Sequence, residues 1–214
     1  MLIAIDIDAV MADLLSMFLK YRNHKYGTKW RRDEFFTYEW YKVFEEPKDE
    51  MYKILYDFFH SEFMARIEPM PGAIVGVRHL HKSHKLDVIT SRPRIIEAET
   101  RAWLDLYFPH TFEKIYFSNQ PAFNSFGRHK GEICSDIDAD LFIDDQYGYG
   151  VECAGKGILV FLFDNPWNQG VVLPPNMTRV HDWNEILKNV NSIDEVKSNN
   201  DKAFSFSSER TRGE

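Results

Sequence analysis

The chain has 214 residues, 44% of them hydrophobic and 28% charged, which suits one globular α/β domain with an inserted subdomain. Its formal net charge of −7 argues against a general nucleic-acid-binding or anionic-membrane surface, and no apolar run approaches the roughly 20 residues that span a bilayer. The two cysteines, Cys134 and Cys153, form no C-x-x-C pair, and no secretory signal precedes residue 2, so we expect reduced thiols and a cytoplasmic location.

Short apolar runs alternate with helix-like stretches along most of the chain. We expect strands at residues 2–8, 86–91, 114–118, 141–145 and 158–163. We expect helices at residues 73–81, 94–107, 129–135, 149–155 and 183–190. Strands that are apolar at nearly every position and alternate with helices are typical of a parallel sheet covered on both faces. The predicted fold class is therefore α/β, with a Rossmann-like parallel sheet flanked by helices.

Residues 14–68 interrupt this alternation. They hold 15 of the chain's aromatic residues, which total 5 Trp, 10 Tyr and 17 Phe, and they end at a Pro-Met-Pro-Gly sequence. We interpret them as a helical cap inserted between strands one and two, with residues 1–13 and 69–190 forming the α/β core. Residues 191–214 are polar and without periodicity, so a disordered tail is expected there.

Two pairs of acidic residues follow apolar runs. Asp6 and Asp8 follow the first run, and Asp144 and Asp145 close the run at 141–143. In open α/β sheets, ligands bind beyond the carboxyl ends of the strands, so these acids are expected to meet at one edge. Carboxylates crowded without a cation would repel one another or take up protons. The pattern therefore indicates a site for a hard divalent cation.

Hydroxyl groups and a lysine are expected at the same edge. Thr90 and Ser91 end the second strand, and Pro93 favours the start of a helix whose amides can cradle phosphate. Lys130 opens a later helix and could supply a positive charge. With the four acids, these residues include the parts that metal-assisted phosphoryl transfer requires: a nucleophile, an acid/base, a phosphate clamp and cation ligands.

The order D-x-D-x-V, strand-terminal Thr-Ser, lysine and apolar run ending in Asp-Asp resembles the four signature motifs of the haloacid dehalogenase superfamily, whose members are mostly phosphohydrolases. The resemblance covers residues 1–190. Within the superfamily, residues 6–13, 90–93 and 142–145 resemble the 5′(3′)-deoxyribonucleotidase-like family. One departure is Ala9, where that family usually has glycine, and residues 164–168 are similar to uncharacterised members.

The resemblance implies a role for each candidate residue. Asp6 would attack phosphorus and become an aspartyl-phosphate, while Asp8 would protonate the leaving oxygen and then deprotonate the hydrolytic water. Mg²⁺ would be held by Asp6, the backbone carbonyl of Asp8 and Asp145, with Asp144 close behind. The phosphoryl oxygens would be bound by Thr90 or Ser91 and by Lys130.

We therefore predict a Mg²⁺-dependent phosphomonoester hydrolase acting on nucleoside or deoxynucleoside 5′-monophosphates. The cap aromatics are expected to serve mainly as core, with two or three, drawn from residues 35–44, contacting the base. The alternatives are a phosphatase of another small metabolite, a metal-free carbon–halogen hydrolase and a non-catalytic phosphate-binding regulator. The extra acids argue against the dehalogenase, because a metal-free site gains nothing from them. The sequence leaves a homodimer open.

Overall fold

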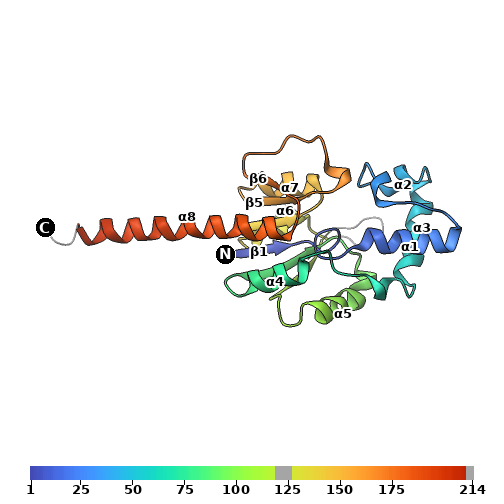
Figure 1. Cartoon of the computed structure of the whole chain (residues 1–214), viewed down its shortest axis with the longest axis horizontal. Helices are drawn as coiled ribbons and strands as arrows, with labels where there is room; N and C mark the ends of the chain where they lie inside the picture. Colours follow the sequence, from blue (N-terminus) through green and yellow to red (C-terminus); the bar gives the residue numbers. More distant parts are fainter. Residues whose placement is uncertain (119–126, 211–214) are drawn as a thin grey trace.

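The computed structural model describes residues 1–118 and 127–210 of the chain (Figure 1). Its sheet has parallel strands in the order β3-β2-β1-β4-β5-β6. The strands are β1 Leu2–Ile5, β2 Lys85–Thr90, β3 Ile115–Phe117, β4 Leu141–Asp144, β5 Leu159–Phe163 and β6 Met177–Val180. The α/β class and the parallel sheet are confirmed. β1 lies between β2 and β4, so the strand order reverses beside it, and such a switch point is where α/β sheets bind ligands.

Helices connect these strands. The α-helices are α1 Leu14–Tyr26, α2 Trp40–Val43, α3 Lys48–Phe59, α4 Ala73–His81, α5 Glu97–Tyr107, α6 Lys130–Asp136, α7 Tyr147–Ala154 and α8 Trp183–Arg210. Single 3-10 turns lie at η1 Arg32–Glu34, η2 Met64–Arg66, η3 Arg94–Ile96 and η5 Pro166–Asn168. The predicted helices are all present, with ends displaced by a few residues at most, except for α8.

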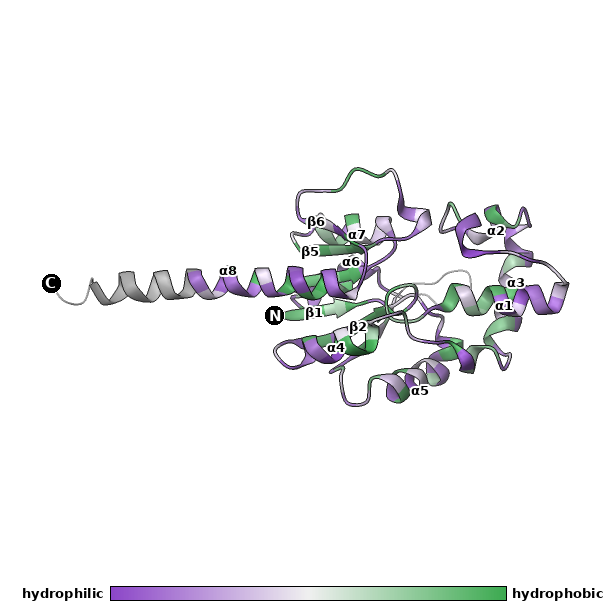
Figure 2. Cartoon of the chain, viewed as in Figure 1, coloured by the Kyte–Doolittle hydropathy of each residue, from purple (hydrophilic) through white to green (hydrophobic). Residues whose placement is uncertain are grey.

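The strands bury side chains on both faces of the sheet. In β4, Leu141 and Ile143 join one hydrophobic layer, while Phe142 between them joins the opposite layer with residues of α6 and α7. This alternation follows from the two-residue period of a strand. Covered on both sides, the sheet leaves its strand ends as the place for polar side chains. Figure 2 shows β1 and β5 coloured mainly as hydrophobic.

Helices α1, α2 and α3 gather beyond the carboxyl end of β1, opposite the side from which α8 projects (Figure 1). Asp13 caps α1 by accepting a hydrogen bond from the Ser16 backbone N–H at 3.3 Å. Inside this group Phe18, Phe35 and Phe58 are fully buried, and the Phe18 and Phe58 rings meet edge to face at 5.3 Å. These rings therefore serve as core, and they belong to the same hydrophobic cluster as one face of the sheet.

Helix α8 corrects the sequence prediction. Its backbone remains helical to Arg210, so the expected disorder is wrong for residues 191–210, while residues 211–214 lie outside the described residues. Two polar contacts hold the helix past residue 190: Asp194 Oδ2 lies 3.2 Å from His84 Nε2, and Lys197 forms an ion pair with Asp140 at 2.9 Å. These contacts come from residues distant in sequence, which periodicity does not reveal. No helix in the described part of the chain is both long and apolar enough to cross a membrane.

Candidate active site

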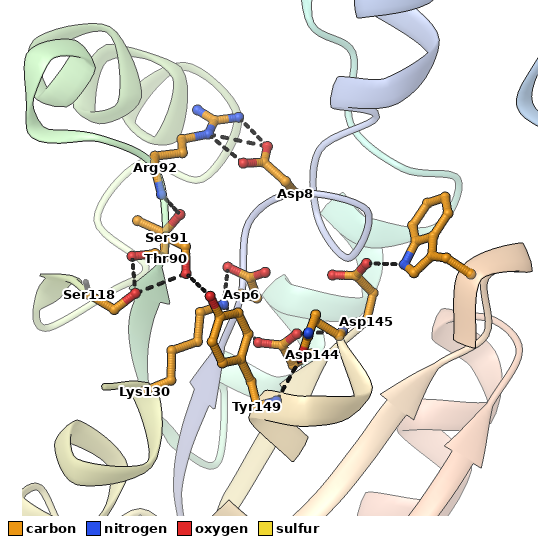
Figure 3. A network of polar contacts seen from close by, with 12 residues as sticks. Asp6, Asp8, Thr90, Ser91, Arg92, Ser118, Lys130, Asp144, Asp145 and Tyr149 are labelled. Carbon is orange, nitrogen blue, oxygen red and sulfur yellow. Dashed lines mark hydrogen bonds and ion pairs between the residues drawn. The ribbon is translucent and has the colours of Figure 1, made fainter. Parts of the chain in front are cut away.

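Three of the predicted acids meet at the carboxyl edge of the sheet (Figure 3). β1 pairs with β4, and the Asp6 backbone N–H continues that pairing by donating to the Ile143 carbonyl at 2.9 Å. Asp6, Asp144 and Asp145 are buried, and each offers a carboxylate oxygen within 4.8 Å of the others. The adjacent parallel strands thus bring their terminal acids together, as the sequence analysis expected.

Lys130 lies among these acids at the start of α6 (Figure 3). Its Nζ donates to Asp144 Oδ2 at 2.7 Å and lies 2.9 Å from Asp6 Oδ1. Burial alone would lower the pKa of Lys130, but the carboxylates of Asp144 and Asp6 outweigh it and raise that pKa. The lysine is therefore a fixed positive charge beneath the strand ends.

The site fits a divalent cation because one ammonium does not balance the clustered carboxylates. Asp6 Oδ1 is buried and accepts no hydrogen bond of good geometry within the described part of the chain. Burial, with the neighbouring Asp144 and Asp8, raises the pKa of Asp6 to about 7, although Lys130 acts to lower it. Burial, with the neighbouring Asp144 and Asp6, also raises the pKa of Asp145. Oxygen ligands with surplus negative charge are what Mg²⁺ requires.

Asp144 and Asp145 differ in their surroundings. Both oxygens of Asp144 accept hydrogen bonds, one from Lys130 and the other from the Gln146 backbone N–H at 2.7 Å. Asp145 instead lines the cavity described below, and its Oδ2 accepts from Trp167 Nε1 at 2.7 Å. Asp144 is therefore placed to hold Lys130, and Asp145 is the better candidate for a metal ligand.

Thr90 and Ser91, predicted as a pair, do different things. Thr90 is fully buried, and its Oγ1 accepts from the Arg92 backbone N–H at 3.1 Å, so it shapes the turn after β2. Ser91 lines the cavity; its Oγ lies 2.9 Å from Ser118 Oγ and 3.3 Å from the Tyr149 hydroxyl. Ser91 is thus the hydroxyl placed to meet a ligand. Ser118 and Tyr149 were not predicted.

Asp8 is held by a residue that the sequence analysis did not single out. Arg92 Nε donates to Asp8 Oδ1 and Oδ2 at 3.2 and 3.0 Å, and Nη2 donates to Oδ1 at 2.7 Å (Figure 3). The Asp8 carboxylate turns toward Arg92 and takes no part in the three-acid cluster. A guanidinium that grips both carboxylate oxygens fixes their orientation. Asp8 is therefore a positioned carboxylate beside the cluster.

Ala9 follows Asp8 with φ +59°, in the left-handed region that favours glycine. The Met11 and Ala12 backbone N–H groups donate to the Ile7 carbonyl at 2.8 Å, closing a tight turn that demands this conformation. This turn also ends β1 at Ile5, earlier than expected. The glycine usual in the resembled family is explained by the turn.

A cavity of about 260 Å³ lies between the acids and the cap. Its floor includes Asp6, Asp145 and Ser91, and Trp167 forms part of its wall. The cap supplies aromatic side chains to the opposite wall: Tyr38, Trp40, Tyr41, Tyr52 and Phe59. The cavity therefore joins a charged end to a mainly aromatic one.

Of the aromatic residues between 35 and 44, Tyr38, Trp40 and Tyr41 line the cavity, whereas Phe35 and Phe44 are buried in the cap. The Tyr38 residue is 43% exposed, yet local burial and the nearby Tyr149 and Asp145 raise the pKa of its phenol. Tyr38 therefore stays a neutral hydrogen-bond donor at the cavity.

Comparison with known proteins places this chain in a family. A family model described as 5′ nucleotidase, deoxy (pyrimidine), cytosolic type C protein (NT5C) matches residues 1–193. The chain belongs to this family. It is a phosphatase of the haloacid dehalogenase superfamily, and its reaction is the hydrolysis of phosphomonoesters. No curated protein matches the chain.

Solved structures share the fold of this NT5C-family chain. A haloacid dehalogenase-like hydrolase from Streptococcus pneumoniae has 16% identity and a TM-score of 0.66, covering 88% of this chain and 97% of its own. A predicted phosphatase from Clostridium acetobutylicum has 13% identity and a TM-score of 0.63, covering 89% and 98%. A magnesium-bound hydrolase from Bacillus subtilis has 15% identity and a TM-score of 0.60, also covering 89% and 98%.

Proposed function

We propose that the protein hydrolyses nucleoside or deoxynucleoside 5′-monophosphates in a Mg²⁺-dependent reaction through a phosphorylated Asp6. The observation that carries this proposal is a cavity that joins the acids beside Lys130 to the aromatic wall of the cap. A phosphate group and a flat base match these two ends. The family description, which names a deoxy pyrimidine 5′ nucleotidase of cytosolic type, agrees with the substrate and with a cytoplasmic location.

Asp6, Asp145 and the backbone carbonyl of Asp8 would hold Mg²⁺, with Asp144 behind them holding Lys130. The close grouping of the Asp6, Asp144 and Asp145 carboxylates around a single ammonium, that of Lys130, supports this assignment. Bound Mg²⁺ would supply charge neutralisation at the phosphoryl oxygens.

The chain's own residues then divide the chemistry. Lys130 and Ser91 bind the phosphoryl oxygens, and Asp6 attacks phosphorus as the bond to the leaving oxygen breaks. Asp8 donates the proton that the leaving nucleoside oxygen needs. In the second step Asp8 takes a proton from water, which attacks the phosphorus of the aspartyl-phosphate, releases phosphate and restores Asp6.

Substrate preference would come from the cap, because the sheet-edge residues meet only groups that every phosphomonoester shares. Stacking a base on an aromatic side chain contributes roughly 1–3 kcal/mol. Tyr38 and Tyr41 are the rings we assign to this contact. Trp40 is tied to the cap core, where its ring lies 5.0 Å from that of Phe18.

A panel of phosphomonoesters tests the proposal, with phosphate release measured with and without Mg²⁺. We expect Mg²⁺-dependent turnover and higher kcat/KM for nucleoside monophosphates than for sugar phosphates of similar size. Tyr38→Ala and Tyr41→Ala should each reduce kcat/KM for nucleotides by about 5–150-fold, the range that this stacking energy implies, and spare a sugar phosphate, which has no ring to stack. Phe36→Ala is the matched control, because Phe36 is 68% exposed and does not line the cavity.

A further inference from the structure

The loop after β5, residues 164–168 (Asp-Asn-Pro-Trp-Asn), is held rigidly beside the acid cluster. Asn168 Nδ2 donates to the carbonyls of Phe163 and Asp145, both at 2.8 Å. From β6, Arg179 Nη1 donates to Asp164 Oδ1 at 2.6 Å, and Nη2 donates to the Asn168 carbonyl at 2.7 Å. Bonds to both neighbouring strands fix the loop, and with it the position of Trp167.

Trp167 connects this loop to the metal-ligand candidate Asp145. Its indole Nε1 donates to Asp145 Oδ2 at 2.7 Å. A carboxylate with one oxygen bonded to a rigid donor cannot rotate freely. The indole therefore fixes the orientation of the Asp145 carboxylate relative to that of Asp6.

Arg32, from the cap, lies over the ring of this tryptophan. Its guanidinium carbon is 5.5 Å from the centre of the Trp167 ring, in the range of a cation–π contact. Nη2 donates to Asn165 Oδ1 at 2.6 Å, and Nη1 donates to Asp13 Oδ1 at 2.8 Å. Arg32 thus connects the cap to the loop at residues 164–168, and that loop positions Asp145 through Trp167.

We propose that Trp167 is a positioning residue for Asp145 in the metal site, and that Arg32 connects the cap to that site through Trp167. The inference rests on the metal site of the proposed function and adds a structural connection between the cap and Mg²⁺ binding. Partners that orient a ligating side chain without touching the metal typically change metal affinity by about 10–100-fold when removed. Here the partner also lines the substrate cavity.

Trp167→Phe tests the hydrogen bond directly, because it keeps a ring under Arg32 and removes the N–H donor. Isothermal titration of the full-length protein with MgCl₂, without substrate, should show Kd raised by about 10–100-fold. Melting of the metal-free variant establishes that it is folded. Trp30→Phe is the matched control: a cap tryptophan outside the cavity, expected to leave the Kd unchanged.

Arg32→Met is a second variant, and it tests the proposal even if Trp167→Phe does not fold correctly. It should weaken Mg²⁺ binding less than Trp167→Phe does, and the double variant should bind Mg²⁺ no more weakly than Trp167→Phe alone, because Arg32 acts through Trp167. A wild-type Kd in Trp167→Phe would overturn the inference and leave the proposed function intact. A wild-type protein that binds no Mg²⁺ would overturn the metal site itself.

Discussion

Replacing Arg92 by methionine should lower the free energy of unfolding by about 3 kcal/mol. The Arg92 side chain is 1% exposed and donates three hydrogen bonds to Asp8 from two nitrogens, so its loss leaves the Asp8 carboxylate without its ion-pair partner. Removing one partner of a buried ion pair costs about 3–5 kcal/mol. Asp8 keeps some access to water, being 25% exposed, and this places the expected value at the lower end.

Urea unfolding followed by tryptophan fluorescence measures this loss. Arg101→Met is the matched control, because Arg101 is 47% exposed and pairs with Glu97 on the surface, where such a pair contributes about 0.2–1 kcal/mol. Adding Asp8→Asn to Arg92→Met should recover part of the stability, since it removes the unpaired charge. Equal losses in Arg92→Met and Arg101→Met would refute the assignment of Arg92 as the residue that holds Asp8.

Asp6→Asn should lower phosphatase turnover by roughly a thousandfold or more with the fold retained, and near-normal activity would contradict covalent catalysis. Mg²⁺ should raise the melting temperature of the wild type, and the rise should be larger at pH 8 than at pH 6, because the pKa of Asp6 is near 7 and protons compete with the cation. Asp145→Ala should abolish most of that rise. Without Mg²⁺ the free energy of unfolding should fall as the pH increases from about 4 to 7, because Asp6 in the folded protein keeps a proton that it has lost in the unfolded chain. An increase in the free energy of unfolding over that pH interval would contradict the burial of this carboxyl. Gly76→Ala should destabilise by about 1–3 kcal/mol, because its Cβ would lie 2.3 Å from the Trp183 ring, whereas Gly155→Ala, with ordinary contacts, should not.

The meeting of the acids could be predicted because it follows from local pattern and general topology. Apolar runs around 2–5 and 141–143 indicate covered parallel strands, and the carboxyl ends of such strands share one edge. The placement of Lys130 required the resemblance, since a lysine at a helix start is usually solvated. Strand β6 was missed because its four residues, Met-Thr-Arg-Val, alternate too briefly to be distinguished from a loop.

The contacts that organise the site could not be predicted from local sequence. Arg92 reaches Asp8 across 84 positions, and Trp167 reaches Asp145 across 22, so no local spacing connects them. The different roles of Thr90 and Ser91 depend on which of the two hydroxyls the turn after β2 directs into the cavity. Such pairings arise from tertiary packing, and only the folded chain reveals them.

Initial rates of phosphate release from a deoxynucleoside 5′-monophosphate, measured with and without Mg²⁺ beside a sugar phosphate of similar size, test the proposed function most directly. We expect turnover that requires Mg²⁺ and a higher kcat/KM for the nucleotide. Equal or better efficiency on the sugar phosphate would contradict the nucleotidase assignment, and turnover unchanged by removing Mg²⁺ would contradict the metal site.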